Sequence, residues 1–164
     1  MKILQCSLIA LLCFVLSVAY AEQQGATPDS ATQAAQSQLI NSKLLVENGR
    51  AKSTIPGIKV SAGYLKLTNN SKQTMRFTGA KTTAAKYTEF HKMVMRDSKM
   101  AMRKVKIIEI KPQQSFEFRE HGYHIMFMGI KQRFKPGESI TLTLIEDNGQ
   151  TYDLLLPIVI IKSH

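Results

Sequence analysis

The chain has 164 residues, 44% of them apolar, and its 22 Lys and Arg residues against 12 Asp and Glu give a net charge of +10. This length suits one domain that buries a hydrophobic core without metal or disulfide support. The apolar content excludes a disordered chain, and the size and pattern exclude a two-domain enzyme or a polytopic membrane protein.

Residues 1–21 have the pattern of a secretory signal peptide. Lys2 gives a short positive start, Ile3–Val18 is mostly apolar, and Ala19-Tyr20-Ala21 places small residues where signal peptidase cleaves. The alternative is an uncleaved anchor helix, but the apolar stretch is short for a membrane span. A lipoprotein signal is disfavoured as well, because Leu11-Leu12-Cys13 is early and bulky. We therefore expect export to the periplasm without stable membrane insertion.

Both cysteines, Cys6 and Cys13, lie within this predicted signal, so the mature chain contains none. A disulfide framework, a cysteine nucleophile, an iron–sulfur cluster and a cysteine-based zinc site are thereby excluded. Removal of Lys2 with the signal leaves 21 basic against 12 acidic side chains, a net charge of +9.

Residues 22–43 are rich in Gln, Ala, Ser and Thr and are predicted to form a flexible leader. The folded domain is predicted to span residues 44–161, because short β patterns separated by turn residues replace any helical period there. Ser139–Leu144 alternates cleanly, and Asn148-Gly149 predicts a type I′ hairpin turn before a closing strand. The other strands are expected at residues 63–68, 76–79, 90–95, 105–110, 116–118, 123–128 and 152–161. This pattern predicts an all-β fold, an antiparallel sandwich or barrel.

Soft metal ligands gather in one window of the mature chain. Methionine is normally a flexible gap-filler in a core, but histidines within the same strand patterns favour metal binding over packing. Six of the seven mature methionines and three of the four histidines lie in this window: Met93, Met95, Met100, Met102, Met126, Met128, His91, His121 and His124.

Strand alternation places these side chains on shared faces. A hairpin turn at Arg96-Asp97 sets His91 opposite Met102, whereas a turn one residue later pairs Met102 with Met93 and leaves His91 on the diagonal. Alternate residues of segment 123–128 share a face as well. If the two strand groups are neighbours, either register allows four side chains to converge: His91, Met102, His124 and Met126.

The donor types indicate the ion. Thioethers are weak ligands for zinc, calcium or magnesium and good ligands for Cu(I), and imidazole binds both copper states. A blue-copper electron-transfer site needs a thiolate, which the mature chain lacks. Neutral ligands hold the ion loosely enough to release it. The predicted chemistry is carriage of Cu(I) and not catalysis, in keeping with the lack of G-x-S-x-G or H-E-x-x-H motifs.

The spacing of His91, ten residues, Met102, twenty-one residues and His124-Ile-Met126 resembles the H-x10-M-x21-H-x-M motif of the PCuAC periplasmic copper chaperones. The flanking residues Gly122–Lys131 agree, and the similarity covers residues 44–161. The resemblance implies a cupredoxin-like antiparallel β-sandwich of Greek-key type that binds Cu(I) through His91, Met102, His124 and Met126.

The resemblance also implies a function and partners. It implies an exported chaperone that hands Cu(I) to the copper subunit of cytochrome c oxidase or works with a Sco-type protein, and we expect a monomer. The chain departs from the family at His121, where a small residue is usual. Its end, Ile161–His164, lacks the His- and Met-rich tail with which some members bind Cu(II).

Two alternatives remain open. One is a module that sequesters zinc or copper without a transfer partner, in which zinc would use His91, His121 and His124 with Glu120. The other assigns the function to charge, but the basic residues are dispersed and lack the interleaved aromatics of a nucleic-acid platform, so we expect no nucleic acid. The basic residues nearest the site are expected to steer docking onto an acidic acceptor: Arg96, Lys99, Arg103 and Lys104.

Overall fold

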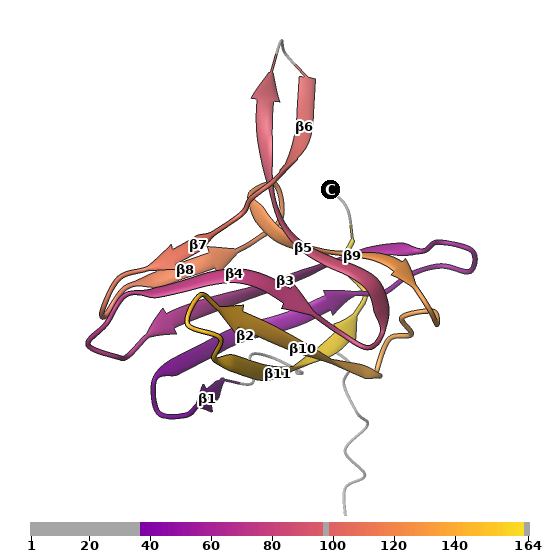
Figure 1. The fold of residues 1–164 in the computed structure, drawn as a ribbon. Helices are drawn as coiled ribbons and strands as arrows, with labels where there is room; N and C mark the ends of the chain where they lie inside the picture. The colour runs from indigo at the N-terminus through magenta and orange to yellow at the C-terminus, as the bar shows by residue number, and fades with distance from the viewer. Residues whose placement is uncertain (1–36, 97–98, 163–164) are drawn as a thin grey trace, which may run out of the picture. The chain divides into compact units, whose positions relative to one another are not determined.

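The computed structural model describes residues 37–96 and 99–162 (Figure 1). The predicted signal peptide and residues 22–36 of the predicted leader lie outside this range. All regular elements in the described residues are strands, and none of those residues forms a helix able to cross a membrane. The all-β prediction is therefore confirmed for the described part of the chain.

The described strands number eleven and form one continuous sheet. They are β1 (Gln38–Ile40), β2 (Leu44–Lys52), β3 (Val60–Asn69), β4 (Met75–Lys81), β5 (Ala85–Arg96), β6 (Lys99–Lys104), β7 (Ile108–Ile110), β8 (Ser115–Phe118), β9 (Tyr123–Ile130), β10 (Ser139–Glu146) and β11 (Thr151–Val159).

The strand order is β6-β5-β9-β3-β2-β11-β10-β4-β7, with β1 paired to β2 and β8 paired to β3. The pairings are antiparallel except for β11 with β2, which run parallel where Ile158 and Val159 lie beside Ala51 and Lys52. The expected antiparallel sheet is thus a mixed one. β11 joins the part of the sheet that holds β10, β4 and β7 to the part that holds β2, β3, β9, β5 and β6.

The core fixes the strands that carry the predicted ligands. On β9, Ile125 and Phe127 are completely buried, and on β5 Phe90 is buried against the ring of Phe118 at 5.5 Å between centroids. Phe127 also meets Phe134 edge-on at 5.7 Å. Burying each such side chain contributes about 1.5–3 kcal/mol. Because side chains alternate along a strand, this packing turns the intervening residues of β5 and β9 to the opposite face.

The ordered sheet begins before the predicted domain start at Leu44. Strand β1 pairs with β2 through Gln38 opposite Val46 and Ile40 opposite Leu44. The side chain of Gln38 also bonds both backbone groups of Leu155, at 2.7 Å to the carbonyl oxygen and 3.1 Å from the amide nitrogen. The last residues of the predicted leader therefore belong to the sheet.

The turn between β10 and β11 differs from the predicted type I′ turn. Gly149 has a φ of +84°, but Asn148 is not among the described residues with positive φ, and a type I′ turn needs both. The amide of Glu146 instead donates to the carbonyl of Gln150 at 2.9 Å, which closes a three-residue loop. The glycine was correctly placed at a hairpin turn, and the turn type was wrong.

Candidate metal site

The hairpin of β5 and β6 rises as an arm above the rest of the domain (Figure 1). Its strands pair from Arg96 opposite Lys99, through Met93 opposite Met102, to His91 opposite Lys104. This is the second of the two registers allowed by the sequence. Met102 therefore lies diagonal to His91, and its direct partner is Met93.

Strand β9 lies on the other side of β5, so the two groups of predicted ligands are neighbours. His91 pairs directly with His124, and Glu89 pairs with Met126. The two imidazole rings lie 6.0 Å apart between centroids at an angle of 48°. The register thus places His124 beside His91 and sets Met102 and Met126 on its two diagonals, on one face of the sheet.

A cavity of about 490 Å³ opens on this face. Three of the predicted ligands line it, namely Met102, His124 and Met126, together with Met93 and several apolar residues from the β2–β3 connection. Burial is graded across the site, since His124 is 6% exposed and Met102 is 50% exposed. One side of the site is therefore enclosed and the hairpin side is open to solvent.

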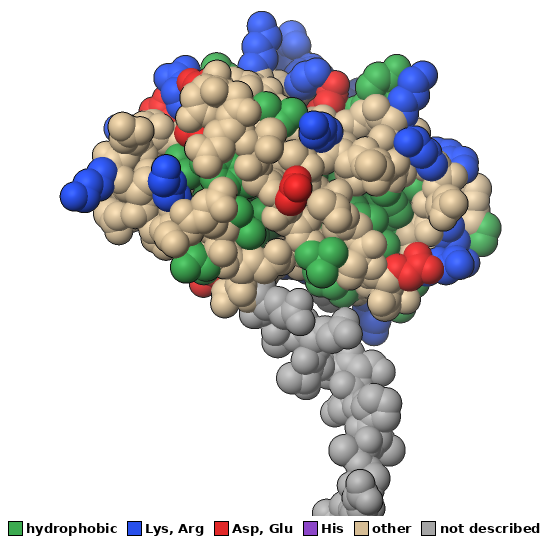
Figure 2. Space-filling model, turned by 60° about the horizontal axis from the view of Figure 1, so that its bottom comes forward, with side chains coloured by type: hydrophobic (Ala, Val, Ile, Leu, Met, Phe, Trp, Pro, Cys, Tyr) green, Lys and Arg blue, Asp and Glu red, His purple; other side chains and the backbone are tan. Residues whose placement is uncertain are grey.

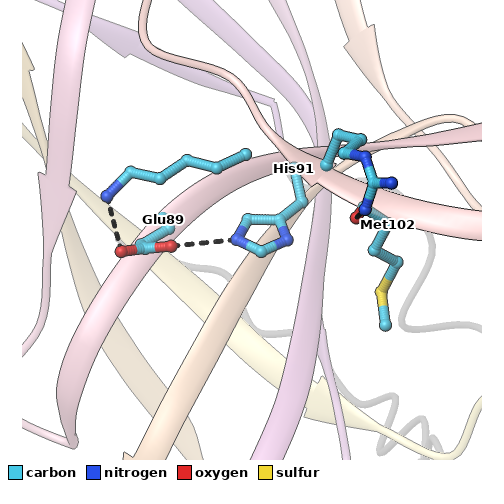
Figure 3. A network of polar contacts seen from close by, with 5 residues as sticks. Glu89, His91 and Met102 are labelled. Carbon is cyan, nitrogen blue, oxygen red and sulfur yellow. Dashed lines mark hydrogen bonds and ion pairs between the residues drawn. The ribbon is translucent and has the colours of Figure 1, made fainter.

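His91 is held by a carboxylate that sequence reasoning missed. Its Nε2 lies 3.0 Å from Oε2 of Glu89, whose Oε1 accepts from Nζ of Lys104 at 2.6 Å (Figure 3). The hydrogen bond from Lys104 has the larger effect and the one from His91 the smaller, and both lower the pKa of Glu89. A carboxylate accepts and does not donate, so Nε2 of His91 carries a proton. A Glu two residues before a His on a strand shares its face, and that was the available signal.

This bond leaves Nδ1 of His91 with the lone pair. Nδ1 is buried and has no hydrogen-bond partner among the described residues. In Figure 3 this nitrogen lies on the side of the ring toward Met102, away from Glu89. Buried polar atoms are almost always paired, and a ligating histidine usually gives its other nitrogen to a carboxylate or carbonyl. An unpaired Nδ1 and an Nε2 bonded to Glu89 together make the arrangement expected of a metal-ligating histidine.

His124 is oriented in the same way. Its Nδ1 lies 3.1 Å from the carbonyl oxygen of Gly122, which can only accept, so Nδ1 donates and Nε2 keeps the lone pair. Burial lowers the pKa of His124, the hydrogen bond to Gly122 opposes this effect, and the nearby His91 adds to it. The ring therefore stays neutral, the form that binds metal, further into the acidic range than a free histidine.

The described residues do not bring the three histidines of the zinc alternative together around one point. His121 lines the same cavity, but it is exposed and sits in a turn with a φ of +59°. This left-handed backbone favours glycine, which gives a physical reason for the small residue that is usual in the family. In the described part of the chain no group of three or more His, Cys, Asp or Glu side chains is placed to hold one ion.

The basic residues near the site have different surroundings. Lys104 is bound to Glu89, and Arg103 donates to the carbonyl of Met102 at 3.3 Å. Arg103 also pairs with Lys92, so both point to the face opposite His91. On the side of the domain seen in Figure 2, Lys and Arg side chains are scattered and form no continuous stripe.

Comparison with known proteins gives the family. Residues 44–158 match the LpqE-like family, described as "Putative lipoprotein LpqE-like". The chain belongs to the LpqE-like family. Within the curated proteins it resembles "Putative lipoprotein Lxx21020" of Leifsonia xyli subsp. xyli, at 25% identity over 114 residues, which is 69% of each chain. Cys13, the cysteine of the disfavoured lipoprotein signal, lies outside the described residues.

Several solved structures with a similar fold are PCuAC domains or DR1885, two of them in a copper-bound form. The copper-bound PCuAC domain from PmoF2 has a TM-score of 0.64 at 14% identity and covers 77% of this chain and 99% of its own. The Cu(I) form of DR1885 from Deinococcus radiodurans has a TM-score of 0.56 at 25% identity, covering 79% and 83%. The apo PCuAC domain from PmoF1 has a TM-score of 0.63 at 16% identity, covering 77% and 100%. These likenesses confirm the resemblance to PCuAC domains and the cupredoxin-like β fold.

Proposed function

We propose that this domain is exported, binds Cu(I) through His91, Met102, His124 and Met126, and hands the ion to an acceptor protein. The observation that carries the proposal is Nδ1 of His91, which is buried and has no partner within residues 37–96 and 99–162. It lies on a face with two thioethers and a second oriented imidazole. The copper-bound PmoF2 domain and the Cu(I) form of DR1885 support it, since both share the fold.

The donor set suits carriage. Two imidazoles and two thioethers are all neutral, and soft thioethers favour Cu(I) over zinc or calcium. His124 is buried on the enclosed side, whereas Met102 is half exposed on the hairpin arm. An acceptor thiolate or imidazole therefore reaches the ion from the side of Met102, and Met102 is the first ligand to be displaced.

The acceptor is proposed from the PCuAC resemblance. The copper subunit of cytochrome c oxidase or a Sco-type protein would take the ion in the periplasm, and the domain would act as a monomer and not as an enzyme. Arg96, Lys99 and Arg103, on the reverse face of the arm from Met102, would attract an acidic acceptor at long range and raise the rate of encounter. Lys104 no longer belongs to this group, because it is bound to Glu89.

The test combines Met102→Leu with Met126→Leu. These nearly isosteric changes should each cost less than about 1.5 kcal/mol of stability. Cu(I) affinity, measured without oxygen against bathocuproine disulfonate, should fall by more than about 100-fold, the upper effect of losing a second-shell partner. Met128→Leu is the matched control, because it changes a methionine on β9 outside the proposed ligand set. Unchanged affinity in the double variant, or stoichiometric zinc binding without Cu(I) binding, would refute the proposal.

The second candidate is sequestration without a dedicated partner. It is favoured by the enclosure of His124, which slows release of the ion. Mixing the Cu(I)-loaded chain with the soluble domain of an oxidase copper subunit separates the two candidates. Rapid, salt-dependent transfer supports the chaperone, and tight binding without transfer supports sequestration.

A further inference from the structure

The hairpin arm carries three methionines that the proposed site does not use. Met95 lies directly opposite Met100, and the next pair on the same face is Met93 opposite Met102. His91 follows on that face of β5. The arm therefore presents two successive thioether pairs that lead from its tip to the His91 site.

Core packing does not explain Met95 and Met100. Met95 is 67% exposed and Met100 is 50% exposed, so neither fills a gap in the core. The opposite face of the arm is basic at both ends, with Lys92 beside Arg103 and Arg96 beside Lys99. Thioethers thus occupy one face of an exposed ribbon and cations the other.

The spacing allows sulfur atoms to share an ion. Residues directly opposed in an antiparallel pair have Cβ atoms about 4.5–5.5 Å apart, and methionine has three rotatable bonds beyond them. The Met95 and Met100 thioethers can therefore meet on one Cu(I). Successive pairs on one face are about 6.8 Å apart along the strands. The sulfurs of the neighbouring pair, Met93 and Met102, can therefore reach the same ion.

We propose that Met95 and Met100 form a second, outer Cu(I) site, which exchanges the ion with the His91 site by way of Met93 and Met102. The exchange part of the proposal rests on the proposed function, whereas binding at the outer pair does not. Each step is a ligand exchange in which a new Cu–S bond forms as an old one breaks. The metal stays Cu(I), and no proton or electron is transferred.

The inner site should bind Cu(I) more tightly than the outer site, which favours movement of the ion inward. The outer site has thioethers alone, and cationic side chains on the reverse face oppose the approach of a positive ion. The inner site adds two oriented imidazoles, one of them held by the Glu89 carboxylate. Cu(I) captured at the tip therefore moves toward His91 and His124.

The experiment uses the chain from residue 22 with ¹³C-labelled methionine methyl groups, titrated with Ag(I) as a redox-inert substitute and then with Cu(I). The first equivalent should shift the methyl signals of Met102 and Met126. The second should shift those of Met95 and Met100. In the Met95→Leu/Met100→Leu variant the second equivalent should no longer bind, the affinity of the first should be unchanged, and stopped-flow loading should slow several-fold.

Leucine keeps the apolar surface and removes only sulfur, so a tip that serves merely for docking would load and bind as the wild type does. That result, or Met95 and Met100 signals that do not move with the second equivalent, would overturn the proposal. Failure of the inner site gives a different result, namely no shift at Met126 in the wild type. Met128→Leu again serves as the control for methionine replacement on the same face.

Discussion

Glu89 determines which nitrogen of His91 is left with a lone pair, and so which one the proposed copper site would use. Its carboxylate accepts from Nε2 at 3.0 Å and leaves Nδ1 with the lone pair. Replacing Glu89 with Gln keeps an acceptor oxygen but removes the negative charge, and charge-assisted hydrogen bonds are about twice as strong as neutral ones. Replacing it with Ala removes the acceptor altogether, so His91 is free to rotate and to change tautomer.

The expected loss of affinity can be set against the loss of stability. Removing a partner of a metal ligand weakens metal binding by about 10–100-fold, which corresponds to about 1.4–2.8 kcal/mol. We expect Glu89→Gln near the lower end and Glu89→Ala near the upper end. The ion pair with Lys104 is worth at most about 1 kcal/mol, because the Lys104 side chain is 60% exposed. Affinity should therefore fall much more than the free energy of unfolding.

The assay is Cu(I) competition at neutral pH, with urea unfolding of the metal-free variants beside it. Glu109→Gln is the matched control, since Glu109 on β7 also forms an exposed ion pair, with Arg76 at 3.1 Å. Nitrogen-15 spectra should show the Nε2–H tautomer of His91 in the wild type and a mixture in Glu89→Ala. The reasoning is refuted if Glu89→Ala binds Cu(I) as tightly as Glu109→Gln does.

Three further predictions concern the fold. Tyr152→Phe should lower the free energy of unfolding in urea by about 1–3 kcal/mol, because the Tyr152 hydroxyl donates to the buried Glu146 carboxylate at 2.8 Å; an unchanged midpoint would contradict this. Gly63→Ala should destabilise the chain by about 1–3 kcal/mol, since a Cβ there would lie 2.9 Å from the ring of Phe127, and a thermal melt checks it. Burial lowers the pKa of His124 in the folded state. As the pH falls, the unfolded chain is therefore protonated at His124 before the folded chain is, and the apo protein should lose stability below about pH 6.5. His124→Asn should flatten that dependence, and an equally steep loss in the variant would argue against the assignment.

Local patterns predicted much of the fold, because alternation along a strand depends only on neighbouring residues. Ile140, Leu142 and Leu144 are buried as their spacing indicated, and β9 turns Ile125 and Phe127 to the core. The turn after β10 was placed correctly for the same reason. Its type was not, since the hydrogen bond from Glu146 to Gln150 decides it.

Pairing between strands was beyond local reasoning. Two registers of the β5–β6 hairpin were open, and they differ in whether Met93 or His91 faces Met102. The parallel contact of β11 with β2 joins segments more than a hundred residues apart in the chain, and so does the bond from the Gln38 side chain on β1 to Leu155. Glu89 was missed because the predicted strand began at Phe90, whereas β5 begins at Ala85 and so includes Glu89 two residues before His91.

The sequence by itself determined the donors and their order: two imidazoles and several thioethers without any thiolate, at a spacing that resembles one copper family. Donor softness is a property of each side chain and needs no fold to be known. The tertiary structure decided which of these donors share a face and which nitrogen of His91 is left without a partner. The reason is that registry follows from packing, since the burial of Phe90, Ile125 and Phe127 sets β5 against β9 and so brings His91 beside His124.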